Sequence, residues 1–221
     1  MRPSDSASSL PERRASIPYP PPTRWVAIRS SNTLLLKALL RVEADAPIPW
    51  SEALSRSREL KLFVSPSVEN WTLVIGNALP DPVEDIDRCY HFLTSLSREI
   101  GEVQFFAMDR VLNFHTWARL RDGRVVRGYS WSADVRWNEG RITMDERLLG
   151  LRARPYAESP EPVAYGEVSP EQTNTERLLL LARRWSLDPV TASEIIIHQE
   201  QCASSDDDRN RDGDPDRDSL H

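Results

Sequence analysis

The sequence predicts the α+β fold class: a mixed, mainly antiparallel sheet with helices packed on one face, a disordered N-terminal arm and an acidic C-terminal tail. Three observations lead to this prediction. Of the 221 residues, 39% are hydrophobic and 28% are charged, which is typical of a globular chain. Short apolar runs of strand composition alternate with helical patterns, and the Asp122-Gly123 dipeptide favours a hairpin. A sheet of about five to seven strands is expected.

Composition divides the chain into five segments. Residues 1–22 are rich in Ser, Pro and Arg, and we expect a disordered arm because little apolar surface is available to offset chain entropy. The α+β domain is expected over residues 23–157 and a proline-containing linker over 158–173. A C-terminal helical pair over 174–203 and an acidic disordered tail over 204–221 complete the chain.

The first part of the domain alternates between strands and short helices. Strands are predicted at residues 25–28, 62–64 and 71–75, and helices at 34–42 and 50–58. The second and third strands are almost fully apolar, which indicates positions inside the sheet rather than on a solvated face.

The helix predicted over residues 82–100 has the clearest signals. Asp81 suits its N-cap, Pro82 its first position and Gly101 its left-handed end. One apolar stripe recurs at three- and four-residue steps: Ile86, Cys89, Tyr90, Leu93, Leu96 and Ile100. We expect this stripe to pack on one face of the sheet, with the C-terminal helices against another edge.

A strand at residues 103–108 precedes the hairpin centred on Asp122-Gly123. A two-residue loop pairs Arg121 with Arg124 and fixes the remaining register. One face then carries Phe114, Thr116, Ala118, Leu120, Val125, Arg127, Tyr129 and Trp131, and is predicted to be core. The other carries His115, Trp117, Arg119, Val126, Gly128 and Ser130, and is predicted to be open or covered by a partner.

The remaining elements are helical. Thr143 and Glu146 have the spacing of a capping box for a short helix that ends at Gly150. Two helices follow over residues 174–185 and 189–202, the second capped by Asp188.

The candidate binding site is the second hairpin face, which brings together His115, Trp117, Arg119 and Ser130. A polar surface flanked by tryptophan suits a small anion or an acidic peptide. The alternative is a solvated or helix-covered strand face, with arginine stems lying over Trp117.

Several functional classes lack their signals. The residues from Ile75 to Pro80 contain one glycine where a phosphate loop needs several, and no Gly-x-Ser-x-Gly elbow is present. Cys89 lies on an apolar stripe, and none of the four histidines pairs with another by sequence.

Charge and hydropathy limit the partners. The formal net charge is −6, and Arg110, Arg119, Arg121, Arg124, Arg127 and Arg136 alternate with carboxylates, so a nucleic-acid partner is not expected. No apolar run approaches the length of a membrane-spanning helix, and two distant cysteines suit a reducing cytoplasm.

The tail resembles the start of an EF-hand or dockerin-like calcium loop. Asp208, Asn210, Asp212 and Asp214 stand at alternate positions, and Gly213 suits the turn. Pro215 and Ser219 depart from the pattern, the latter where a bidentate carboxylate should close the site. Calcium is therefore the one cofactor suggested, and a plain acidic tail with no cofactor is the alternative.

The central stretches Phe63-Val64-Ser65-Pro66, Trp71 to Gly76, Gln104-Phe105-Phe106 and Trp117-Ala118 resemble a group of uncharacterised bacterial proteins. The resemblance covers residues 25–156 and extends to residues 184–189. It implies a bacterial cytoplasmic α+β domain and carries over no catalytic residue.

These observations favour a non-enzymatic binding module whose partner is another protein, with an accessory role in a bacterial defence or toxin-immunity locus as one setting. The expectation depends on the missing catalytic cluster and on Trp50, Trp117, Trp137 and Trp185 at element edges, where aromatic rings anchor partners. The alternative is a small hydrolase or transferase that uses His115 with Asp109 or Glu139. The oligomeric state is left open.

Overall fold

The computed structural model describes residues 21–42, 48–158 and 167–199. In these ranges, seven strands form one sheet in the order β2-β3-β1-β4-β5-β6-β7, and every strand pair is antiparallel. The α+β class is therefore confirmed. The described strands include no parallel pair, so this sheet is antiparallel and not mixed as predicted.

The strands are β1 (Arg24–Ile28), β2 (Phe63–Val68), β3 (Trp71–Ile75), β4 (Glu102–Asp109), β5 (Phe114–Arg121), β6 (Arg124–Ser132) and β7 (Asp134–Gly140). The helices are α1 (Thr33–Leu39), α2 (Trp50–Ser55), α3 (Ile86–Ile100), α4 (Met144–Leu148) and α5 (Pro170–Trp185). A further helix, here called the C-terminal helix, runs from residue 189 to residue 199.

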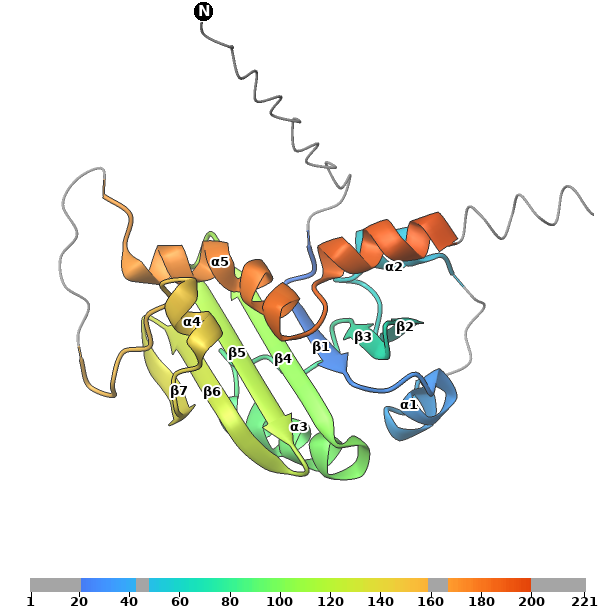
Figure 1. The fold of residues 1–221 in the computed structure, drawn as a ribbon, viewed down its shortest axis with the longest axis horizontal. Helices are drawn as coiled ribbons and strands as arrows, with labels where there is room; N and C mark the ends of the chain where they lie inside the picture. The colour runs from blue at the N-terminus through green and yellow to red at the C-terminus, as the bar shows by residue number, and fades with distance from the viewer. Residues whose placement is uncertain (1–20, 43–47, 159–166, 200–221) are drawn as a thin grey trace, which may run out of the picture.

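Helices cover both faces of the sheet, whereas the sequence predicted them on one face. In Figure 1, α5 crosses in front of the sheet and α3 lies behind it. We call these the α5 face and the α3 face. The C-terminal helices were expected against an edge. They lie instead across the α5 face, because its sheet residues are as apolar as those facing α3.

The α3 face is packed by the predicted amphipathic helix. Cys89, Leu93 and Leu96 are buried against strand residues such as Phe105 and Leu120. Asp85, rather than Asp81, caps the helix by accepting a hydrogen bond from the Arg88 backbone amide. Burial of each large side chain contributes roughly 1.5–3 kcal/mol, which is enough to fix α3 to the sheet.

The α5 face is packed by aromatic residues. The indole of Trp50 donates to Ser193 Oγ at 2.8 Å and thereby ties α2 to the C-terminal helix.

The four tryptophans that were expected at element edges, as anchors for a partner, are all buried: Trp50, Trp117, Trp137 and Trp185. They hold the domain together, so that part of the expectation was wrong.

A bulge in β6 changes the predicted hairpin register. Leu120 pairs with Val125 as predicted, but Arg119 pairs with Arg127, which leaves Val126 as an extra residue. Beyond the bulge, every β6 side chain is reversed. The α5 face therefore receives Arg127, Tyr129 and Trp131, beside His115 and Trp117, whereas Gly128 and Ser130 face α3. The predicted assignment of these five β6 residues was wrong.

Gly128 shows why the reversed register fits. The indole of Trp137 on β7 lies against its Cα, and an added Cβ would stand 2.5 Å from that ring. Only glycine leaves room for Trp137 at this position.

The chain ends fall largely outside the described residues. These include the predicted arm up to residue 20 and the tail at 204–221. The helix α5 begins at Pro170, capped by Ser169 Oγ, so helix replaces the last part of the predicted linker. Among the described helices, none has both the length and the apolar character that crossing a membrane requires.

Candidate functional site

The four residues predicted to form one site lie in three different environments. His115 and Trp117 are buried beneath α5. Ser130 is on the α3 face, where its hydroxyl lies 2.7 Å from that of Thr116. Arg119 is on the α5 face but at the half-exposed end of the sheet, beyond the helix. The structure therefore keeps only His115 and Trp117 together.

His115 has a structural environment. Its Nε2 accepts from Asn174 Nδ2 at 3.1 Å, so Nδ1 carries the proton and donates to Thr175 Oγ1 at 3.0 Å. The ring stacks on Trp117 and Tyr129. Burial lowers the pKa of His115 to about 3, which keeps the imidazole neutral near neutral pH. It holds α5 on the sheet.

The carboxylates considered as partners of His115 are engaged locally. Asp109 Oδ1 accepts hydrogen bonds from the backbone amides of Val111 and Leu112. Glu139 Oε2 accepts from the Trp137 indole at 3.0 Å. Neither carboxylate hydrogen-bonds with His115, so the geometry offers no acid–base pair there.

A buried ion pair lies beside Trp117. Arg127 Nε donates to Glu146 Oε1 at 2.9 Å, and the two side chains are 0% and 1% exposed. Trp117 Nε1 donates to the same oxygen, while Arg127 Nη1 reaches the backbone oxygens of Gly128 and Glu139. The sequence indicated only that Glu146 caps α4, which it does through its other oxygen.

The exposed end of the α5 face carries a second group, here called the Glu102 cluster: Glu102, Arg29, Arg119 and Arg121. Glu102 Oε1 accepts from Arg119 Nε and Nη2 at 2.9 and 2.6 Å. Its Oε2 accepts from Arg29 Nη1 at 3.3 Å and from Arg121 Nη2 at 3.2 Å. Three cations share one carboxylate, so the cluster has a formal charge of +2.

The cluster exposes its cations and covers its anion. The side chains of Arg29, Arg119 and Arg121 are 62%, 29% and 55% exposed, against 5% for Glu102. Burial alone would raise the pKa of Glu102, but the hydrogen bonds and charge of Arg119, and then of Arg121, outweigh it and lower that pKa. Each guanidinium has five N–H groups, and Glu102 engages only one or two of each.

The sequence could not group these residues. Arg29 lies 73 positions from Glu102 along the chain. Arg119 and Arg121 were visible as part of a local arginine run, but their shared carboxylate comes from a neighbouring strand. Alternation along β5 was the only available signal, since residues two apart share a face.

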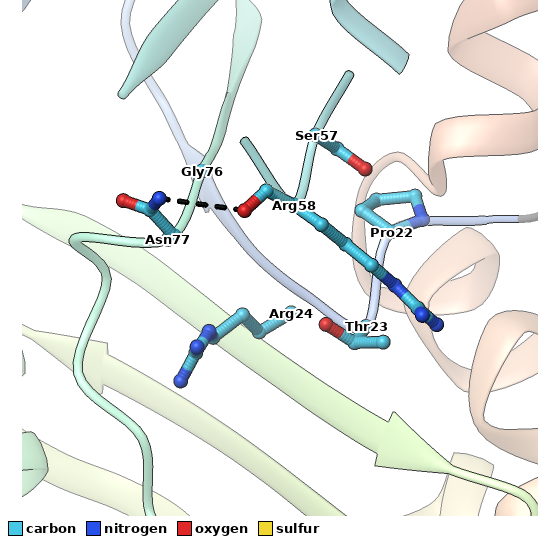
Figure 2. Close-up of a pocket in the computed structure, with 7 residues that line it drawn as sticks. All are labelled: Pro22, Thr23, Arg24, Ser57, Arg58, Gly76 and Asn77. Atoms are coloured by element: carbon cyan, nitrogen blue, oxygen red, sulfur yellow. Dashed lines mark hydrogen bonds between the residues drawn. The ribbon is translucent and has the colours of Figure 1, made fainter. Parts of the chain in front are cut away.

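A polar pocket of about 260 Å³ lies at the opposite end of β1 (Figure 2). Its walls come from three segments: residues 22–24, residues 57–58 after α2, and residues 76–77 after β3. The backbone amides of Asn77 and Ala78 donate to the carbonyls of Leu60 and Lys61. These two amides are therefore not directed at a phosphate.

Burial raises the pKa of Cys89 to about 12, which keeps its thiol protonated on α3. Within the described ranges, no three His, Cys, Asp or Glu side chains are placed to hold a metal ion. The calcium-loop residues Asp208, Asn210, Asp212 and Asp214 lie outside those ranges.

Neither protein families nor curated proteins nor solved structures gave a match to this chain.

Proposed function

We propose that this chain is a non-enzymatic interaction module that binds an acidic segment of another protein through the Glu102 cluster. One observation carries the proposal. Arg29, Arg119 and Arg121 converge on a single covered carboxylate, which leaves two positive charges and most guanidinium N–H groups directed away from it.

The chemistry of the cluster favours carboxylates as the ligand. Planar guanidinium groups bind carboxylates through paired N–H donors, and Glu102 holds three of them in place before a partner arrives. The chain as a whole has a net charge of −6, so the positive charge of the cluster is opposite in sign to the overall charge and favours acidic segments locally.

The affinity should be modest. A hydrogen bond to a charged group contributes about 1.5–3 kcal/mol. Three guanidiniums would thus support binding in the millimolar to micromolar range, which suits a transient partner. Exposed contacts of this kind also weaken as salt is added.

The remaining chemistry of the described residues gives catalysis little support. His115 is neutral, buried and bonded to α5, and the Cys89 thiol is buried and protonated. The hydrolase or transferase alternative would need a reactive group with access to a substrate, and His115 is 0% exposed.

The test is a titration with a labelled poly-glutamate peptide at low salt, followed by fluorescence anisotropy. The variant R119Q/R121Q should raise Kd about tenfold or more, because two of the three contact groups lose their charge. The matched control is R56Q/R136Q. It removes the same charge from two similarly exposed arginines that pair elsewhere, with Glu52 and Asp134.

Two results would contradict the proposal. One is the absence of saturable binding to the wild-type protein at low salt. The other is an equal loss in both double variants, which would show that the peptide responds only to net charge.

A further inference from the structure

The pocket at the start of β1 has the lining of an anion site. Its seven lining residues include two arginines, two hydroxyl residues and one amide, and no carboxylate: Pro22, Thr23, Arg24, Ser57, Arg58, Gly76 and Asn77. The balance of charge in the lining is therefore positive, and its side chains offer mainly hydrogen-bond donors.

The walls are held in place without a ligand. Asn77 Nδ2 donates to the carbonyls of Arg58 and Glu59 at 3.3 and 3.2 Å, which ties the loop after β3 to the turn after α2. Gly76 has φ +138°, and an added Cβ would stand 2.5 Å from the Lys61 carbonyl oxygen. This close approach requires glycine and fixes the spacing of the two walls.

The two arginines of the lining differ in their ion pairing. Arg24 forms a salt bridge of 2.8 Å with Asp81, which neutralises it and holds it at the pocket wall. The Arg58 side chain extends past Pro22 and Thr23 (Figure 2), and its guanidinium has no ion-pair partner among the described residues. Its neighbour Arg56, by contrast, pairs with Glu52 and Glu59.

From this lining we infer that the pocket binds a small oxyanion, with the Arg58 guanidinium as the charged contact. The ligand class is inorganic phosphate or a small phosphate monoester. A volume of about 260 Å³ lies just below the roughly 300–1,000 Å³ of ordinary small-molecule sites, which leaves room for a small phosphate monoester as well as for phosphate itself.

This site is independent of the proposed protein interaction. The pocket lies at the Arg24 end of β1, whereas the Glu102 cluster contains Arg29, which directly follows the other end. The two sites share no residue, so either can fail without the other.

The test is an NMR titration of the full chain with inorganic phosphate at constant ionic strength, observing the backbone amides of Thr23, Arg58, Gly76 and Asn77. Saturable shifts confined to this group are expected in the millimolar range. R58Q should raise Kd about tenfold or more, because the charged contact is lost. R56Q, two residues away but outside the lining, should change it less than about twofold.

Glycerol phosphate and glycerol distinguish the sources of the oxyanion. Tighter binding of the ester than of inorganic phosphate would assign the site to phosphate monoesters, and the reverse order to free phosphate; glycerol should not bind. The inference is overturned if phosphate gives no saturable shift, or if R58Q, with an unchanged melting curve, binds as the wild type does.

Discussion

Two arginine–glutamate groups lie on the same face of one sheet and differ in charge balance. The pair of Arg127 and Glu146 is fully buried, with one cation for one anion. The Glu102 cluster is at the exposed end, with three cations for one anion. Their chemistry is the same, but one joins α4 to the sheet out of reach of water, and the other is open to water at its arginines.

The difference in charge balance between the two groups follows from their difference in burial. A charge removed from water must be neutralised and hydrogen-bonded, because its desolvation costs several kcal/mol. An arginine in contact with water pays no such penalty and can remain in excess over its counter-ion. The excess on the Glu102 cluster is therefore compatible with binding, whereas the buried pair has a structural role.

The largest effect is expected for Glu146→Gln. This change leaves the Arg127 charge buried without its anion and weakens the Thr143 cap, so the free energy of unfolding should fall by about 3–5 kcal/mol. Urea unfolding followed by circular dichroism measures it. A loss below about 1 kcal/mol would mean that water reaches Arg127 and that the contrast in burial is wrong.

The pH dependence of stability should also come from the buried region. The pKa of His115 is about 3 in the folded protein and about 6.5 in an unfolded chain. The unfolded state therefore binds the proton first, and stability should fall as the pH decreases through this window. The loss should reach about 2 kcal/mol between about pH 7.5 and pH 5.

His115→Gln provides the comparison for that measurement. Its stability should be lower than that of the wild type at neutral pH, but its decline towards pH 5 should be shallower. Parallel pH profiles for the two proteins would show that the His115 imidazole takes up its proton as readily in the folded protein as in the unfolded chain.

A smaller effect is expected for Glu102→Gln. Its arginines can turn to water when the anion is lost, so the free energy of unfolding should fall by about 1 kcal/mol. This loss should shrink as salt is added, while that of Glu146→Gln should not, since salt screens exposed charges. Equal salt dependence of the two losses would contradict the comparison.

The smallest effect is expected for Arg121→Gln. The side chain is about half exposed and makes one bond to Glu102, so thermal unfolding should show a change within about 0.5 kcal/mol. Binding of poly-glutamate should nevertheless weaken. A large stability loss with unchanged binding would make the cluster purely structural.

Local sequence signals were sufficient for several elements. The stripe of Cys89, Leu93 and Leu96 predicted α3 and its buried side, because helical periodicity is set by neighbours along the chain. The Asp122-Gly123 turn gave the pairing of Arg121 with Arg124. The capping box of Thr143 and Glu146 is present as predicted.

The same signals misplaced the candidate site. Both faces of the hairpin contain aromatic residues, so alternation could not reveal the extra residue at Val126. It also could not show that α5 covers His115. The tryptophans assigned to element edges are buried for the same reason: the segments that pack against them, such as the C-terminal helix against Trp50 and β4 against Trp185, are distant in the chain.

The sequence by itself determined the fold class, the main helix and the hairpin turn, since each depends on residues within a few positions of one another. Only the tertiary structure decided which arginine is buried with Glu146 and which three share Glu102. Those choices depend on the β6 bulge and on which strands and helices pack together, and contacts between segments as distant as Arg29 and Glu102 leave no mark on local sequence patterns.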